Sequence, residues 1–161
     1  IPDYICPSVI THDGIVYAIG GRRSQCLAVR TGGRGDVTES HKLWQIDVGS
    51  NVPSPVYHEG HLYWMNHRGL VYCVDADSGE IVTQKRTSAG KTYASVTYAD
   101  GRLYAVSREN GAFVFEATPE MPELAHNEIA GDDTIFNGRP TVADGRMYLR
   151  SDAALYCIGK Q

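Results

Sequence analysis

The sequence predicts an all-β protein built from four copies of one four-stranded unit. The motif G-x-x-Y recurs along the chain, starting at Gly14, Gly60, Gly101 and Gly145. Ten tyrosines and seventeen glycines favour strands and tight turns, and no segment carries a convincing helical pattern. An acidic residue precedes each motif glycine. This pairing is typical of a two-residue hairpin turn, in which glycine supplies a positive φ without a Cβ clash.

Each copy reads as strand, turn, strand, turn, strand, turn and strand. The strand-like pieces before the acidic-glycine turns are PSVIT, SPVYH, ASVTY and RPTVA. The third-strand runs are QCLAVR, LVYCVDA, AFVFEA and ALYCIGK. The fourth-strand segments of the first three copies are KLWQID, EIVTQK and, less clearly, ELAHNEI. Several strands (LYWM, LVYCV, FVF) are apolar on consecutive residues, as expected when both faces of a sheet are covered.

A repeat of roughly 40 to 45 residues with four strands is typical of a β-propeller. We therefore predict an all-β propeller segment with about four blades, each a four-stranded antiparallel sheet. It forms one domain over residues 1–161, with repeats at approximately 5–50, 51–91, 92–137 and 138–161. The stretch TPEMPELAHN (118–127) contains two prolines and is expected to be a loop.

The two ends of the repeat array lack partners. The fourth copy stops after its third strand, and the first opens almost at its innermost strand. We expect either the C-terminal portion of a larger propeller or a half-ring that completes itself by association. A self-contained four-bladed ring is the third choice.

The net charge of −4 argues against nucleic-acid and acidic-membrane partners, which need a basic surplus. The arginines are scattered rather than grouped in runs, which points the same way. No apolar stretch approaches the roughly 18 residues that a transmembrane helix requires.

Residues 73–83 read CVDADSGEIVT, which resembles the quinoprotein-type repeat A-x-D-x-x-T-G-K-x-x-W. The residues that fit the pattern are Asp75, Ser78, Gly79 and Glu80. Cys73 replaces the usual Ala and Thr83 the usual Trp. In the first copy Ala28 keeps the Ala, and an insertion delays Trp44. The whole chain resembles the PQQ-like β-propeller superfamily of quinoprotein-type and BamB-like bacterial repeat proteins.

The resemblance implies an exported bacterial protein, periplasmic or extracellular, and two kinds of function. Family members are either non-catalytic scaffolds or quinone-dependent dehydrogenases. The dehydrogenases place a vicinal Cys-Cys disulfide against pyrroloquinoline quinone (PQQ), with Ca²⁺ held by carboxylate and amide groups, and this chain has no Cys-Cys pair. We predict a non-catalytic module that recognises a protein or saccharide partner, without catalytic residues, cofactor or metal. The alternatives are part of a dehydrogenase with PQQ and calcium, and a structural half-ring that self-associates through unpaired edge strands.

The turns between second and third strands all carry arginine. These residues are Arg22, Arg23, Arg68, Arg108 and Arg150. In a propeller such turns share one face with the loops that enter each innermost strand. The arginines therefore predict a rim that binds an anionic or polyhydroxylated ligand, or an acidic protein segment. The competing interpretation is that a polar turn simply needs a soluble residue.

Histidines and cysteines crowd residues 58–73 without forming a metal-binding pattern. His58 and His61 flank one turn and His67 lies in the next, about 17 Å away at strand rise. We interpret them as solvated turn residues rather than ligands. Cys73 and Cys157 occupy equivalent third-strand positions, which predicts a small, buried slot in each blade.

Overall fold

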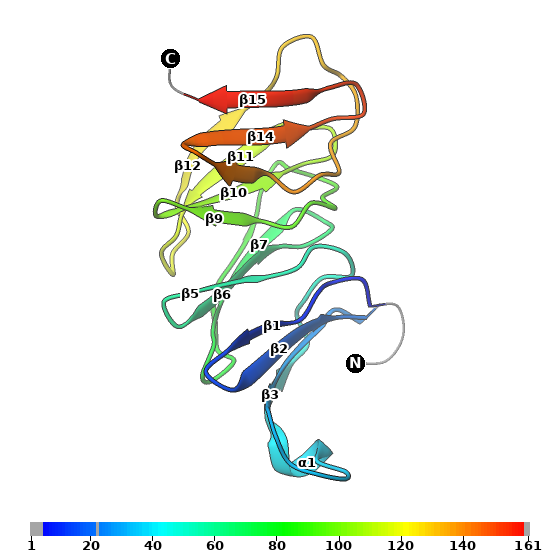
Figure 1. The fold of residues 1–161 in the computed structure, drawn as a ribbon, viewed down its shortest axis with the longest axis vertical. Coiled ribbons are helices and arrows are strands. Elements are labelled where there is room, and N and C mark those ends of the chain that lie inside the picture. Colours follow the sequence, from blue (N-terminus) through cyan, green and yellow to red (C-terminus); the bar gives the residue numbers. More distant parts are fainter. Residues whose placement is uncertain (1–4, 22, 160–161) are drawn as a thin grey trace.

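The computed structural model describes residues 5–21 and 23–159 and arranges them as four antiparallel sheets (Figure 1). We call the sheets blades 1 to 4. Blade 1 holds β1 (Ile10–His12), β2 (Ile15–Gly20), β3 (Gln25–Arg30) and β4 (Lys42–Ile46), and blade 2 holds β5 (Val56–His58), β6 (His61–Met65), β7 (Leu70–Asp75) and β8 (Ile81–Arg86). Blade 3 holds β9 (Thr97–Ala99), β10 (Arg102–Val106), β11 (Ala112–Glu116) and β12 (Glu123–Asn127), and blade 4 holds β13 (Thr141–Ala143), β14 (Arg146–Arg150) and β15 (Leu155–Gly159).

The blades lie one above another along the long axis of the molecule, from blade 1 at the bottom of Figure 1 to blade 4 at the top. Neighbouring strands within each blade follow chain order. The predicted fold class, an all-β propeller segment with about four blades, is therefore confirmed.

Two local expectations are corrected. The insertion between β3 and β4 contains one helical turn, α1 (Thr38–His41), where no helix was expected. The stretch 118–127 is not a loop throughout, because its second half forms β12 and pairs with β11. Both prolines, Pro119 and Pro122, precede β12, so they remove no donor from the ladder.

No helix in the described part of the chain has the length and apolar character needed to cross a membrane.

The four acidic-glycine turns are two-residue hairpins, as predicted. In the first, His12 pairs with Ile15 across Asp13 and Gly14, whose φ values are 44° and 74°. The other three turns repeat these positive angles at Glu59–Gly60, Asp100–Gly101 and Asp144–Gly145. Positive φ at both central residues matches the twist of the flanking strands, which explains the glycine in every copy.

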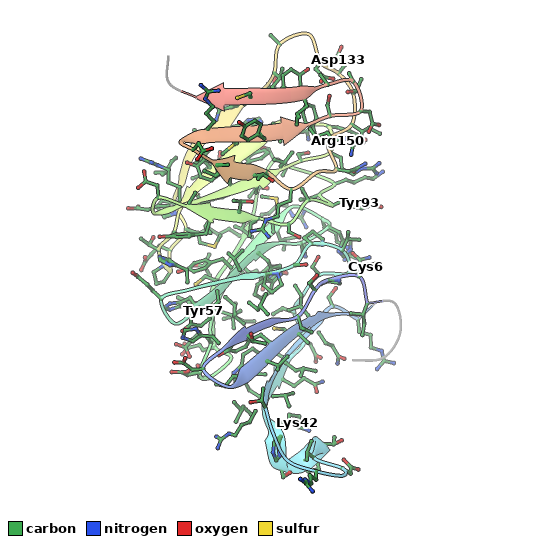
Figure 2. All side chains as sticks on the ribbon, in the orientation of Figure 1. Cys6, Lys42, Tyr57, Tyr93, Asp133 and Arg150 are labelled. Atoms are coloured by element: carbon green, nitrogen blue, oxygen red, sulfur yellow. The ribbon has the colours of Figure 1, made fainter. Side chains whose placement is uncertain are left out.

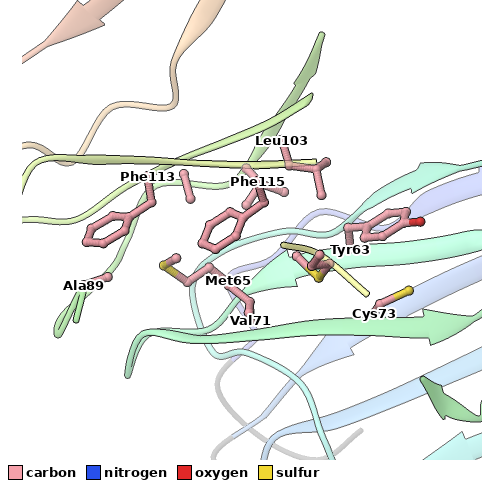
Figure 3. Packing of buried hydrophobic residues seen from close by; sticks show 11 residues of the cluster. Tyr63, Met65, Val71, Cys73, Ala89, Leu103, Phe113 and Phe115 are labelled. Atoms are coloured by element: carbon pink, nitrogen blue, oxygen red, sulfur yellow. The ribbon is translucent and has the colours of Figure 1, made fainter. Parts of the chain in front are cut away.

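Both faces of β6 are buried, which explains its unbroken apolar sequence. Leu62 and Trp64 pack into the cluster shared with blade 1, whereas Tyr63 and Met65 pack into the cluster shared with blade 3. Figure 3 shows the second of these clusters, in which Met65 lies close to Phe115 and Phe113 of blade 3. Burying such side chains contributes roughly 1.5–3 kcal/mol each, so the two interfaces on blade 2 hold blades 1 to 3 together.

Trp44 joins blade 1 to blade 2. It pairs with Ala28 in the β3–β4 ladder, so the insertion delays the tryptophan in sequence without displacing it from its place in the repeat. Its indole nitrogen donates a 2.9 Å hydrogen bond to the carbonyl oxygen of Ala76. A Cβ on Gly79 would lie 2.7 Å from Trp44 Cδ2. The repeat glycine therefore makes room for the indole of the preceding blade.

The two equivalent cysteines differ in environment, which corrects the expectation of a buried slot in each blade. Cys73 is fully buried, whereas Cys157 is exposed. Cys157 pairs with Tyr148 on the face of blade 4 that points away from blade 3, and no described sheet covers that face. Burial raises the pKa of the Cys26 thiol to about 12 and that of Cys73 to about 11. All four cysteines are free thiols in the structure.

Candidate functional site

One edge of the blade stack carries both the arginine turns and the loops that lead into the next blade. Backbone hydrogen bonds connect these turns and loops in succession. The bonds run from Thr92 N to His67 O, from Arg108 N to Lys91 O, from Phe136 N to Arg108 O and from Asp152 N to Ile135 O, at 2.9 to 3.4 Å. Figure 2 shows Tyr93 and Arg150 on this edge, at the right of the view, and Tyr57 toward the opposite edge. The turns of blades 2 to 4 are therefore connected by backbone hydrogen bonds along this edge.

Arg23 and Arg68 meet at a polar pocket of about 300 Å³ between blades 1 and 2, where Arg86 joins them. Arg23 lies in the β2–β3 turn, Arg68 in the β6–β7 turn, and Arg86 at the end of β8. All three side chains are exposed. No salt bridge among the described residues engages any of the three, although Asp47 lines the same pocket.

The pocket rests on two buried polar residues, Asn66 and Tyr72. Asn66 Oδ1 accepts hydrogen bonds from the backbone nitrogens of Arg68 and Leu70, at 2.9 and 3.1 Å. This bonding fixes the turn that presents Arg68. Arg86 Nη1 donates to the Arg68 carbonyl oxygen at 3.3 Å, which holds the two guanidinium-bearing residues side by side.

The local electrostatics are positive. Burial raises the pKa of the Tyr72 phenol, and the charges of Arg86 and Arg68 act on it in the opposite direction. Burial also lowers the pKa of His67, and the charge of Arg68 adds to this decrease. The three guanidinium groups can therefore bind a carboxylate, phosphate or other anion through charge-assisted hydrogen bonds.

Two of the remaining predicted arginines, Arg108 and Arg150, do not line this pocket. Arg108 lies over the Tyr93 ring, 4.5 Å from its centroid, and its Nε donates to Asn137 Oδ1 at 3.0 Å. Arg150 is opposite Leu155 on the outward face of blade 4, where the equivalent residue of blade 2, Met65, is buried. Arg22 lies outside the described residues. The structure thus brings together Arg23 and Arg68, and keeps Arg108 and Arg150 apart from them.

Arg86 was not predicted from the sequence, although it belongs to the pocket. It lies in a fourth strand rather than in an arginine turn, so the repeat comparison did not select it. Its place becomes evident only from the β7–β8 register of the structure, in which Arg86 pairs with Leu70, two residues after Arg68. That register follows from a bulge between Cys73 and Val74, which the sequence pattern does not reveal.

His58 is less solvated than predicted, which corrects the expectation for this residue, whereas the His12 side chain is 44% exposed. His12 stacks on Tyr57 of the next blade with ring centroids 3.9 Å apart, and His58 stacks on Tyr98 at 4.0 Å. The His58 side chain is only 19% exposed. These rings connect the first strands of successive blades. Across residues 5–21 and 23–159, no group of three or more His, Cys, Asp or Glu side chains is arranged to hold a metal ion.

Four stacked sheets with the quinoprotein-type repeat define this chain as a segment of a PQQ-like β-propeller. Residues 33–121 match the family model described as outer membrane protein assembly factor BamB, and the chain belongs to that family. A search of curated proteins finds no match.

Solved structures agree on the fold. BamB from Moraxella catarrhalis is 18% identical with a TM-score of 0.74, and the match covers 96% of this chain and 46% of that one. The computationally designed Ika4 protein is 10% identical with a TM-score of 0.70 and coverages of 98% and 99%. The quinohemoprotein alcohol dehydrogenase ADHIIG from Pseudomonas putida HK5 is 15% identical with a TM-score of 0.67 and coverages of 90% and 28%. This chain therefore spans about half the length of the solved BamB.

Proposed function

We propose that this chain is a non-catalytic binding module of an exported bacterial propeller, and that it recognises an acidic segment of a protein partner. The observation that carries the proposal is the pocket at which Arg23, Arg68 and Arg86 converge. The family description, an outer membrane protein assembly factor, supports a protein partner and a periplasmic location. The pocket is small and fixed in shape by the Asn66 hydrogen bonds, which suits one or two carboxylates rather than a whole domain.

Fluorescence anisotropy with a labelled hexaglutamate peptide tests this proposal. The double variant Arg23→Gln/Arg68→Gln is expected to bind the peptide at least about tenfold more weakly than the wild type, because it removes two of three charge-assisted contacts. Arg102→Gln is the matched control, since Arg102 is an exposed arginine that pairs with Asp100 outside the pocket. Equal binding by the double variant and the wild type would contradict the proposal.

The saccharide alternative is tested in the same assay. Unlabelled polygalacturonate supplies carboxylates on a sugar chain, whereas maltohexaose supplies hydroxyls alone. Competition by polygalacturonate and hexaglutamate, but not by maltohexaose, is expected if the guanidinium groups recognise carboxylates. Competition by maltohexaose alone would instead support a polyhydroxylated saccharide ligand.

Quinone-dependent catalysis is the second candidate, favoured by the shared fold of ADHIIG. The residues described here do not fit the group. They provide no cluster of carboxylate, histidine and cysteine side chains for an ion, and their four cysteines are separate free thiols rather than a vicinal disulfide. We therefore assign no cofactor and no catalytic residue to these residues. Dye-linked alcohol oxidation after addition of PQQ and Ca²⁺ is expected to be absent, and measurable turnover would overturn this assignment.

Ring completion by a second copy is the third candidate. Leu155 is 68% exposed on the outward face of blade 4, whereas its blade 2 equivalent, Val71, is buried against blade 3. The outward face of blade 4 therefore has the character of a surface that receives another blade. The match to almost the whole of Ika4 shows that a protein of this extent adopts the fold. Light scattering that gives a dimer mass would support this candidate, and a monomer at all concentrations would exclude it.

A further inference from the structure

A cleft of about 780 Å³ separates blade 3 from blade 4. The cores of the two earlier interfaces contain large buried side chains, such as Trp64 between blades 1 and 2 and Phe113 between blades 2 and 3. The third interface buries a smaller cluster, which consists of Ala94, Val106, Phe136 and Leu149. The volume falls within the range of roughly 300–1,000 Å³ that is typical of small-molecule sites.

The cleft exists because side chains that close the other interfaces are truncated here. At the first-strand end, histidine–tyrosine stacks connect blade 1 to blade 2 and blade 2 to blade 3. The equivalent residues between blades 3 and 4 are Ala99 and Val142, and both line the cleft. The missing imidazole and phenol rings leave this end open.

The fourth strand of blade 3 also lacks the tryptophan of blade 1, as does blade 2, where Thr83 holds the equivalent position. In blade 1, Trp44 pairs with Ala28 and reaches across to blade 2. In blade 3, the equivalent ladder pair is Val114 and Ala125. An alanine thus stands where blade 1 has the indole that docks on the next blade. The interface between blades 3 and 4 therefore lacks both the histidine–tyrosine stack and the tryptophan contact that join blade 1 to blade 2.

The lining has an apolar interior and an acidic border. Tyr104, Met147, Phe136 and Leu149 supply aromatic and aliphatic surface. Four of the five lining carboxylates, from Glu109, Glu128, Asp132 and Asp133, lie at the arginine-turn end of the cleft, and Asp100 lies at the acidic-glycine end. Among the described lining residues, Arg146 is the single arginine or lysine opposing them. A ligand with an apolar body would pack against the aromatic and aliphatic side chains, and a positive charge on that ligand would be attracted to the carboxylates.

Asp132 is held in place by its hydrogen bonds. Its Oδ2 accepts a 2.6 Å bond from the Tyr156 hydroxyl, and its Oδ1 accepts a 2.9 Å bond from the Thr134 backbone nitrogen. Side-chain hydrogen bonds from Ser151, Thr134 and Tyr156 lower the pKa of the Asp132 carboxyl. This carboxylate is therefore ionised and oriented before any ligand arrives.

We propose that the cleft between blades 3 and 4 binds a small organic cation with an aromatic or aliphatic body. The body lies against Tyr104 and Met147, and the positive charge lies at the carboxylate border. This site differs from the arginine pocket in location and in sign of charge, so its ligand is distinct from the acidic segment proposed above.

Fluorescence titration with proflavine, a cationic tricyclic dye, tests the proposal against fluorescein, an anionic tricyclic dye. We expect saturable binding of one proflavine per chain. In Arg23→Gln/Arg68→Gln protein, which lacks the proposed anion pocket, we expect at least about tenfold weaker binding of fluorescein than of proflavine. The double variant Ala99→His/Val142→Tyr rebuilds the stack found at the other interfaces and fills the first-strand end of the cleft. It is expected to weaken proflavine binding at least about tenfold while raising the Tm. Unchanged affinity in a folded variant would overturn the proposal.

A second variant keeps the test decisive if the filled variant does not fold. Glu109→Gln/Asp133→Asn changes two exposed border residues, so its fold is expected to be intact. Removing two charges is expected to weaken proflavine binding about threefold to tenfold. Asp152→Asn is the matched control, because Asp152 is exposed and does not line the cleft. Equal weakening by the control and the border variant would contradict a local site, as would equal binding of the two dyes to the Arg23→Gln/Arg68→Gln protein.

Discussion

At the scale of single residues, Gly79 of blade 2 leaves the space into which the Trp44 indole of blade 1 packs. Gly79 has a φ of +77°, and the Trp44 indole occupies the space that a Cβ would need. Gly60 has the same φ, but nothing lies within 4 Å of its Cβ position. The two glycines therefore separate backbone strain from steric conflict.

Gly79→Ala is expected to destabilise the protein by about 2–4 kcal/mol, because left-handed strain adds to displacement of the indole. Gly60→Ala is expected to cost about 1–2 kcal/mol from strain alone. Urea unfolding monitored by tryptophan fluorescence measures both. Equal losses of unfolding free energy in the two variants would show that a Cβ at position 79 causes no steric conflict with Trp44.

The buried thiols predict a loss of stability in alkaline solution. The pKa values of Cys26 and Cys73 are raised from 9.0 to about 12 and about 11. Below pH 9 both the folded and unfolded chains keep these protons, so the stabilisation is complete. Between pH 9 and about 11 the unfolded chain loses protons that the folded chain retains. The free energy of unfolding then falls by up to about 1.4 kcal/mol per pH unit for each thiol.

Urea unfolding at pH 8, 9, 10 and 11 checks this dependence. Cys73→Ala is the matched variant, because Ala28 fills the equivalent position in blade 1. The variant is expected to lose stability less steeply than the wild type. A wild-type stability that stays constant from pH 9 to pH 11 is the contrary result.

Residue-level sequence patterns predicted the turns better than the site. An acidic residue before glycine indicates a hairpin from local sterics alone, and all four turns confirm it. Arg86 and the His58–Tyr98 stack depend on how strands from different turns and blades are placed. Their positions follow from the bulge in blade 2 and from blade packing, neither of which leaves a local signature.

At the scale of elements, β15 differs from its counterparts because it ends the described array. The alternating pattern of LYCIG places Tyr156 toward blade 3, whereas Leu155 and Cys157 lie on the outward face. The sequence predicted this strand from its similarity to LVYCV. The similarity also led to the wrong expectation that Cys157 is buried, since burial depends on a covering sheet rather than on the strand itself.

Thiol labelling with 5,5′-dithiobis(2-nitrobenzoate) measures this difference between elements. In Cys6→Ser protein, whose other exposed thiol is removed, Cys157 is expected to react rapidly while Cys26 and Cys73 react only as the protein unfolds. Slow labelling of Cys157 would show that its face is covered. If that protection grows with protein concentration, a second copy provides the cover.

At the scale of the whole molecule, the chain is an open stack of four blades whose two functional candidates carry opposite charge. The fold was predictable because the repeat occurs four times, so each copy supports the others. The sites were less predictable because each lies between blades. Arg23 and Arg68 come from different repeats, and the acidic cleft is lined by Ala99 and Val142, where the other interfaces have a histidine–tyrosine stack.

An NMR titration of the ¹⁵N-labelled chain with hexaglutamate tests the central claim most directly. We predict that amide shifts concentrate at Arg23, Asn66 to Leu70 and Arg86, where the pocket lies, with little change at the acidic-glycine turns on the opposite edge. Shifts confined to those opposite turns, or the absence of any shift at saturating peptide, would contradict the assignment of this chain as an arginine-based binding module.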